Sequence, residues 1–318
     1  MKRRLLVSSL AAALVLVAVA RPPLLAQSPS PGRPLYNPKL PDFNQIQITT
    51  TKAAENLYLL EGGPGSTVGV LAGPDGIFLV DTNYAQLTDK IVAAIRKISN
   101  APVRAVVNTH VHPDHMAANR AFGEMGAMLF ARDELRQRLV TGLADGAGYR
   151  LPSPREELPV VTYAGRTTLH LNGEDIELIP IEHAHTDGDT LVRFPTSDVL
   201  MTGDFFRVVN GYPGFDRNNG GSFKGLVDGL GMVIGLAGPN TKVVPGHGPV
   251  QTRDAVITQR DMMVTVRDRV QSMIRAGRSE AEVIAAKPTR EYDAKVVGGP
   301  ESADRFVRQI YTELKPAN

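Results

Sequence analysis

The sequence predicts a mixed α/β (α+β) fold, and three features of the residue pattern support this prediction. Short apolar runs separated by turns that contain Gly and Pro indicate strands. Apolar residues that recur at helical spacing, as at Leu87, Ile91 and Ile95, indicate amphipathic helices. The order of strands followed by helix occurs twice along the chain, which fits two similar halves. The 318 residues, 42% of them hydrophobic, are enough for a sizeable core.

The first 26 residues have the features of a secretory signal peptide. Lys2-Arg3-Arg4 precede a mostly apolar run from Leu5 to Ala20. The alternative, an uncleaved membrane anchor, is disfavoured because this run is shorter than the roughly 20 residues that span a bilayer comfortably. Cleavage is possible after Ala20, but we favour Ala26. We therefore expect a periplasmic or secreted protein with no stable membrane insertion after cleavage.

The N-terminal segment also explains the basic pI. Residues 1–26 contain four basic residues and no acid, so cleavage would leave 31 basic against 33 acidic residues. The net charge would change from +2 to −2, and it therefore gives no indication of a nucleic-acid partner. The chain contains no cysteine, which excludes disulfides, thiolate metal ligands, a cysteine nucleophile and a cysteine-ligated iron–sulfur cluster.

In chain order, residues 27–44 are predicted to be a linker, because they are rich in Pro and lack an apolar period. Apolar runs bounded by turn residues then predict strands at residues 57–60, 67–71, 77–80 and 103–107. The helix with Leu87, Ile91 and Ile95 lies between the last two strands. The next predicted elements are a helix at 116–122, a strand at 127–130, a helix at 132–140 and a surface loop at 141–159.

The second half opens with a hairpin, because Asn172-Gly173 separates two short strands and is a strong signal for a tight turn. A second hairpin is expected around residues 195–198. A helix at 223–237 should end at Gly238, and a last core strand follows at 241–244. Residues 253–318 are predicted to form a C-terminal helical extension packed on the same domain. Its helices are expected at residues 255–274, 279–285 and 304–314.

A cluster of metal-binding residue types, His110-Val111-His112-Pro113-Asp114-His115, follows the strand at 103–107. Residues two apart on an extended segment point the same way, so His110 and His112 can bind one metal ion. Pro113 forces the chain to turn, which directs Asp114 and His115 towards a different point that suits a second ion. A single histidine is more often a satisfied core or surface residue, but this density of ligands is typical of a metal site.

His-X-His-X-Asp-His resembles the signature of the metallo-β-lactamase superfamily. Three later segments resemble further metal-binding segments of that family, in the family's order: Ala184-His185-Thr186, Thr202-Gly203-Asp204 and Pro245-Gly246-His247-Gly248. The resemblance implies that residues 45–252 form a metallo-β-lactamase-like domain, a four-layer αββα sandwich. One departure is Met116-Ala117-Ala118-Asn119, which stands where many relatives carry glycines and affects only the expected shape of the adjoining loop.

The resemblance also implies two metal ions per chain. The residues that resemble ligands of the first ion are His110, His112 and His185. Those that resemble ligands of the second are Asp114, His115 and His247. Asp204 resembles the carboxylate that bridges both ions. Imidazole and carboxylate ligands suit zinc, with iron or manganese as alternatives. The lactamase subclass that binds its second zinc through cysteine is excluded.

The third ligand of the first ion has an alternative candidate. His183 lies two residues before His185 and would share its face on an extended segment. We favour His185 because Thr186 follows it as in the family, which leaves His183 to line the pocket. Asp81, at the end of the third strand, is expected to bond nearby backbone or a ligand histidine from behind rather than a metal. His170 lies inside a predicted strand and is interpreted as structural.

The implied function is that of an exported, zinc-dependent hydrolase acting on a small-molecule substrate. Two ions about 3.5–4 Å apart can hold a hydroxide at neutral pH, which would attack the carbonyl of an ester, lactone, thioester or β-lactam. Asp114 would orient the hydroxide and relay a proton, so it is the expected catalytic residue. The candidate substrate-binding residues are His183, Arg207, Tyr212 and Asn219. The last three residues lie in a Gly-rich loop, and an ordinary structural role in that loop explains them equally well.

Two alternatives are an iron-dependent redox member of the superfamily and a β-lactamase proper. Di-iron redox members usually carry a flavin domain, and none is visible in this sequence. Persulfide-oxidising relatives lack an intact second ligand set, whereas Asp114, His115 and His247 are all present. A carboxylate rather than a thiolate at position 204 favours ester or thioester substrates over β-lactams.

Overall fold

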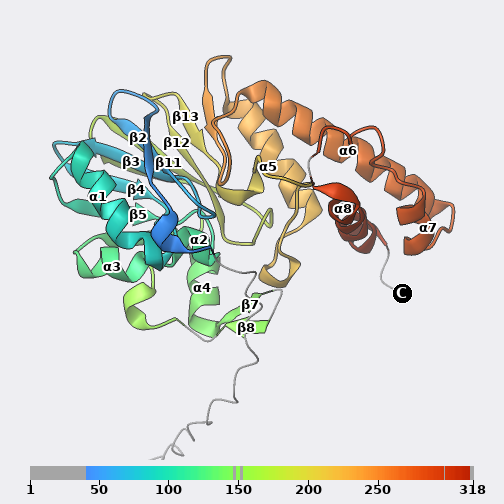
Figure 1. The fold of residues 1–318 in the computed structure, drawn as a ribbon, viewed down its shortest axis with the longest axis horizontal. Helices are drawn as coiled ribbons and strands as arrows, with labels where there is room; N and C mark the ends of the chain where they lie inside the picture. The colour runs from blue at the N-terminus through green and yellow to red at the C-terminus, as the bar shows by residue number, and fades with distance from the viewer. Residues whose placement is uncertain (1–40, 146–147, 151–152, 297, 316–318) are drawn as a thin grey trace, which may run out of the picture. The chain divides into compact units, whose positions relative to one another are not determined.

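Two β-sheets form the centre of the computed structural model, which describes residues 41–145, 148–150, 153–296 and 298–315 (Figure 1). The predicted signal peptide and residues 27–40 of the predicted linker lie outside these ranges. The sheets lie face to face, with helices on the outer face of each. The αββα sandwich implied by the sequence is therefore confirmed.

The first sheet has seven strands in the order β1-β2-β3-β4-β5-β6-β9. Their bounds are Thr49–Lys52, Leu57–Glu61, Val68–Gly73, Gly76–Val80, Val103–Val107, Met128–Arg132 and Val161–Tyr163. Strands β1 to β4 pair antiparallel, and β4, β5, β6 and β9 pair parallel. Parallel pairing brings the carboxyl ends of β4 and β5 to one edge, where Asp81 and the histidine cluster follow them.

The second sheet has five strands in sequence order, β10 to β14. Their bounds are Thr167–Leu171, Glu174–Ile181, Asp189–Phe194, Val199–Met201 and Lys242–Val244. The first four strands pair antiparallel, whereas β13 and β14 pair parallel. The carboxyl ends of β13 and β14 therefore lie side by side, and Asp204 and His247 follow them in the chain.

Helices cover the outer face of each sheet. Helix α1 (Thr88–Ile98) and helix α3 (Asn119–Glu124) pack on the first sheet, where Ile91, Ile95 and Phe122 are buried. On the second sheet lie α5 (Phe223–Leu236), α6 (Arg253–Arg275), α7 (Glu280–Ala285) and α8 (Gly299–Leu314) (Figure 1). The residues of this helical extension share one hydrophobic core with the second sheet. No helix in the described ranges is both long and apolar enough to span a membrane.

The turn at Asn172-Gly173 connects the two sheets. Both residues have positive φ, 54° and 76°, as a tight hairpin turn requires, and they join β10 to β11 as predicted. The Asn172 side chain accepts from the Asp75 backbone N–H at 2.9 Å and donates to the Gly76 carbonyl at 2.8 Å. This turn therefore fixes one end of the second sheet against the β3–β4 turn of the first.

The predictions of local structure were wrong in three places. The helix predicted at 116–122 is two short helices, α2 (Pro113–Met116) and α3, separated by a turn. The loop predicted at 141–159 contains β7 (Leu143–Asp145), β8 (Gly148–Arg150) and a 3-10 turn at Arg155–Glu157, although residues 146–147 and 151–152 lie outside the description. Strands β1 and β9 were missed, because β1 is exposed along its length and β9 has only three residues.

Candidate metal centre

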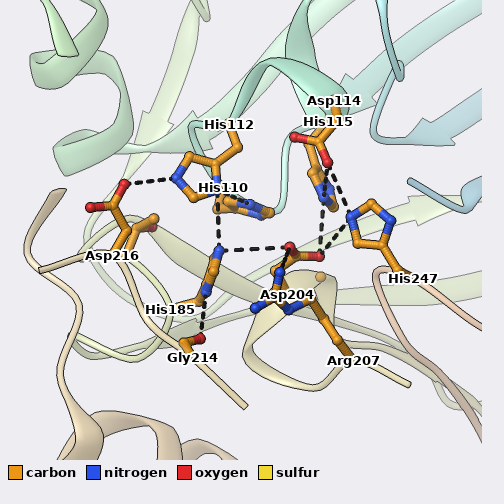
Figure 2. Close-up of polar contacts among 12 residues, drawn as sticks. His110, His112, Asp114, His115, His185, Asp204, Arg207, Gly214, Asp216 and His247 are labelled. Carbon is orange, nitrogen blue, oxygen red and sulfur yellow. Dashed lines mark hydrogen bonds and ion pairs between the residues drawn. The ribbon is translucent and has the colours of Figure 1, made fainter. Parts of the chain in front are cut away.

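Seven side chains converge where the strands of both sheets end (Figure 2). The cluster from His110 to His115 follows β5, and Pro113 begins helix α2 with His112 as its N-cap residue. His185 lies in the turn after β11, Asp204 in a 3-10 turn after β13, and His247 after β14. Because each side chain follows a strand, the two packed sheets fix the direction of all seven.

The first group contains His110, His112, His185 and Asp204. His112 Nδ1 lies 3.1 Å from His110 Nε2 and 3.1 Å from His185 Nε2. Asp204 Oδ2 lies 3.6 Å from His185 Nε2. Three imidazole nitrogens and a carboxylate oxygen therefore face one point, as Figure 2 shows.

The outer nitrogens of the three rings indicate which tautomer each histidine adopts. His112 Nε2 lies 2.9 Å from Asp216 Oδ2, and His185 Nδ1 lies 3.1 Å from the Gly214 carbonyl. His110 Nδ1 lies 3.2 Å from Thr109 Oγ1, which already donates its own hydrogen to Asp81. Each outer nitrogen thus faces an acceptor and should carry the proton.

The inner nitrogens are consequently left with lone pairs directed at one another over about 3 Å. Such an arrangement is repulsive unless a cation lies between the three rings. Tetrahedral sites for zinc are built from imidazole nitrogen and carboxylate oxygen in this way. The first group therefore fits a divalent metal ion.

The second group contains Asp114, His115 and His247 and approaches the other oxygen of Asp204. His247 Nε2 lies 3.0 Å from Asp114 Oδ2 and 3.3 Å from Asp204 Oδ1. His115 Nε2 and Asp204 Oδ1 are buried 3.1 Å apart, yet neither makes a hydrogen bond with any residue that the structure describes. Polar atoms of this kind are costly to bury unless an ion satisfies them, so this group fits a second cation.

The electrostatics of the two groups differ. Burial lowers the pKa of His110 well below its ordinary value and the pKa of His185 to about 3, so both rings are neutral and able to bind metal. Burial also acts to lower the pKa of His115, but the carboxylates of Asp204, Asp81 and Asp114 outweigh it and raise that pKa. The negative charge around His115 is the charge that a divalent ion would neutralise.

Two glycines allow the backbone to approach Asp204. A Cβ atom on Gly246 would lie 2.1 Å from Asp204 Oδ1, so only glycine fits beside this carboxylate. Gly203, the residue before Asp204, has a φ of +55°, which favours glycine. The glycines of Thr202-Gly203-Asp204 and Pro245-Gly246-His247 are therefore explained by the close packing of two strand ends.

The comparison with protein families identifies the family of this chain. Residues 61–247 match the model of the metallo-beta-lactamase superfamily, which is more than half of the 318 residues. The chain belongs to the metallo-beta-lactamase superfamily. The resemblance to this family that the four sequence segments indicated is thereby confirmed.

Two curated proteins are similar in sequence to this chain over part of their length. The chain is 35% identical over 81 residues to a linear primary-alkylsulfatase from Pseudomonas sp. (strain ATCC 19151), which covers 23% of this chain and 15% of that protein. It is 23% identical over 171 residues to the alpha subunit of a 2,4-dinitroanisole O-demethylase from Nocardioides sp. (strain JS1661), with coverage of 51% and 49%. The matches thus span half or less of these relatives.

Solved structures show the same fold at low identity. The inverting sec-alkylsulfatase Pisa1 from Pseudomonas sp. matches with a TM-score of 0.61 and 16% identity, over 84% of this chain and 50% of that chain. The DIM-1 metallo-beta-lactamase matches with a TM-score of 0.56 and 21% identity, over 69% of this chain and 97–98% of the lactamase chains. The match to the alkylsulfatase therefore covers a larger share of this chain than the match to the lactamase does.

Asp81 supports the second group from behind, as the sequence predicted. Its Oδ2 lies 2.7 Å from His115 Nδ1, and its Oδ1 accepts from the Thr109 backbone N–H at 2.7 Å. Asp81 has a φ of +63°, an unusual conformation for a residue other than glycine. This carboxylate fixes both the orientation of His115 and the tautomer that leaves its Nε2 free to bind a metal.

His183 lies outside both groups, although it was the rival for the third ligand. Residues 182–188 form a turn rather than an extended segment, and His183 has a φ of +47°. Its side chain is exposed, with Nδ1 3.1 Å from the Gly220 carbonyl. The alternation that would have given His183 and His185 the same direction does not apply in this turn.

The other three candidate substrate residues occupy different positions. Arg207 Nη1 lies 3.3 Å from Asp204 Oδ2 and therefore borders the first group. Asn219 is buried and donates to Asp216 Oδ2 at 2.6 Å, so it holds the carboxylate that bonds His112. Tyr212 is 4% exposed, and its hydroxyl donates to Asp293 Oδ1 at 2.7 Å, which is the position of a loop anchor.

Asp216 is the functional residue that sequence reasoning missed. It lies 104 residues from His112, and nothing in its local sequence distinguishes it from a turn-forming aspartate. Its Oδ1 accepts from the backbone N–H groups of Asn218 and Asn219, which places Oδ2 for His112. Only the folded loop reveals this contact.

We expect Asp216→Asn to weaken metal binding at the first group by about 10–100-fold, the usual cost of losing an outer partner of a histidine ligand. The amide can keep the turn, but it provides no carboxylate for His112 Nε2–H. Competition with a chelator of known affinity measures the change. Asp228→Asn on the exposed face of α5 is the matched control, and an affinity equal to that of the control would contradict the role of Asp216.

Proposed function

We propose that this superfamily member is a metal-dependent hydrolase of small ester substrates that holds two divalent ions, with zinc as the favoured metal. The observation that carries the proposal is the pair of ligand groups on opposite oxygens of Asp204, with inner lone pairs that require cations. Two divalent ions held by these residues would supply a hydroxide nucleophile near neutral pH and would polarise the bond to be cleaved.

The surroundings of Asp114 support a role for it in proton transfer. Its side chain is 19% exposed, whereas that of Asp204 is 3% exposed and covered by Arg207. Its Oδ2 is 3.0 Å from His247 Nε2 and 3.8 Å from His115 Nε2, at the border of the second group. A carboxylate that both reaches the centre and meets solvent can accept a proton from a nucleophile and return it to a leaving group.

Two ester chemistries fit this arrangement. Carbonyl esters and thioesters are favoured over β-lactams because the two oxygens of the Asp204 carboxylate could bind both ions equally. Sulfate esters are supported by the similarity to the alkylsulfatases, which extends over 84–85% of this chain against 68–69% for the lactamases. An iron-dependent redox activity has no comparable support.

A substrate panel tests the proposal. Zinc-loaded protein should hydrolyse p-nitrophenyl acetate, a thioester or an alkyl sulfate faster than a carbapenem or a cephalosporin. His170→Ala is the matched control, because His170 is exposed and its ring bonds Asp175 on the β10–β11 hairpin, away from both ligand groups. Strong β-lactam turnover without ester or thioester turnover would contradict the ordering, and oxygen-dependent turnover by the iron-loaded protein alone would favour the redox alternative.

We further propose that the protein is exported to the periplasm or beyond. The support is the basic start and apolar run of residues 1–26. N-terminal sequencing of the exported protein should then begin at Gln27, whereas a retained Met1 would refute cleavage.

A further inference from the structure

A cavity of about 570 Å³ lies beside the metal centre. One wall is the loop from Asp204 to Gly214, and the opposite wall is the first half of helix α6. Cavities of roughly 300–1,000 Å³ are typical of sites for small organic molecules. The cavity is therefore large enough to hold part of a substrate.

The cavity adjoins the metal centre through residues that belong to both. Asp204 and Arg207 line it, and the Arg207 guanidinium lies on the Asp204 carboxylate. Gly214 also lines it, and the Gly214 carbonyl accepts from His185 Nδ1. A molecule in the cavity thus lies next to two residues that contact the proposed metal ligands.

The walls of the cavity favour an apolar guest. Leu226, Met262 and Val296 contribute aliphatic surface, and Val208 and Val209 on the loop are 37% and 46% exposed. Among the residues that the structure describes, Asp204 is the only acidic residue that lines the cavity. Exposed aliphatic side chains beside a cavity gain from covering an apolar ligand.

The C-terminal helices build and brace this cavity. Ala255, Gln259 and Met262 recur at helical spacing on one face of α6, and all three follow residue 247, where the family match ends. The opposite wall is fixed to α8, because the Tyr212 backbone N–H donates to Ser302 Oγ at 2.7 Å and the Tyr212 ring stacks on Phe306. The cavity is therefore a preformed feature of this chain rather than of the family's shared core.

We propose that this cavity binds the unbranched apolar chain of the substrate, so that the C-terminal helices set a preference for long-chain esters. This inference rests on the proposed function, because the metal centre must act on the ester group at the inner end of the cavity. Each methylene that leaves water for an apolar wall contributes roughly a fourfold gain in binding. Chain length should therefore control affinity until the cavity is filled.

Binding can be measured without turnover. Calorimetric titration of zinc-loaded protein with butanoate and with octanoate compares two ligands that share a carboxylate and differ only in chain length. We expect octanoate to bind at least tenfold more tightly, since four methylenes would enter the cavity. The same preference should appear in kcat/KM for p-nitrophenyl octanoate against the acetate.

Filling the cavity should remove this preference. Ala255→Trp adds a large side chain inside it, and Thr258→Trp provides a second variant at an exposed lining position if the first fails to fold. Asp268→Trp, on the same helix but outside the lining, is the matched control and should keep the wild-type preference. Metal content should equal that of wild type in all three variants.

The outcomes separate this inference from the proposed function. Octanoate and butanoate of equal affinity in wild type, or an equal preference in wild type and Ala255→Trp, would overturn the chain subsite even if esters are hydrolysed. A chain-length preference that Ala255→Trp removes would support the subsite even if no ester is turned over, in which case the hydrolase proposal alone would fail.

Discussion

Replacing Asp204 with Asn should abolish hydrolysis and lower the affinity for both metal ions together. The Asp204 carboxylate approaches both ligand groups, through Oδ2 to His185 and Oδ1 to His115 and His247. Losing an outer partner of a ligand costs about 10–100-fold in metal affinity, and losing a direct ligand to two ions should cost more at each. Metal content after dialysis and ester turnover measure the two effects.

The control for this experiment is an isosteric change at a carboxylate of similar burial that touches no ion. Glu174, at the start of β11, is 4% exposed and accepts from the Thr196 backbone N–H and the Ser197 hydroxyl, away from both ligand groups. Glu174→Gln should leave two ions bound. If Asp204→Asn instead lost one ion and retained the other at wild-type affinity, Asp204 would belong to one group only.

The second large effect is expected at His185. His185→Ala should remove the first ion and reduce activity by at least about 100-fold, because a nitrogen 3.1 Å from His112 Nδ1 is lost from the converging set. His183→Ala should leave metal content unchanged, because that side chain is exposed and faces Gly220. The two substituted residues are two positions apart in the same turn, so each variant is the control for the other.

The result that would contradict this assignment is specific. Loss of metal in His183→Ala with retention in His185→Ala would mean that the turn at residues 182–188 rearranges when ions bind. Metal content by elemental analysis is the deciding readout, because activity alone would not distinguish a ligand from a residue of the pocket.

The four candidates from His110 to His115 could be named from their local spacing, whereas His185, Asp204 and His247 could be named only from the resemblance to the family. Within His110 to His115, the alternation of a strand end and the turn at Pro113 determine which side chains share a direction. The hairpin at Asn172-Gly173 was predictable for the same reason, since two adjacent residues specify the turn. Local sequence was sufficient wherever the physical constraint was itself local.

Contacts between distant segments could not be predicted in this way. Asp216 and His112 are joined only when the loop after Asp204 folds over the histidine cluster. Tyr212 has a side chain that could hold a substrate, but its hydroxyl donates a hydrogen bond to Asp293 in the C-terminal extension. The same holds for β1, whose exposed residues carry no apolar alternation and which pairs with β2 at the sheet edge.

The proposal that this chain holds two metal ions, one in each ligand group beside Asp204, can be tested by the metal content of the wild-type protein. Purified protein should be stripped with a chelator, reloaded with excess zinc, freed of unbound metal and measured by elemental analysis against protein concentration. We expect two equivalents of zinc per chain, reduced to no more than one in His185→Ala. A well-folded wild-type preparation that never exceeds one equivalent would contradict it.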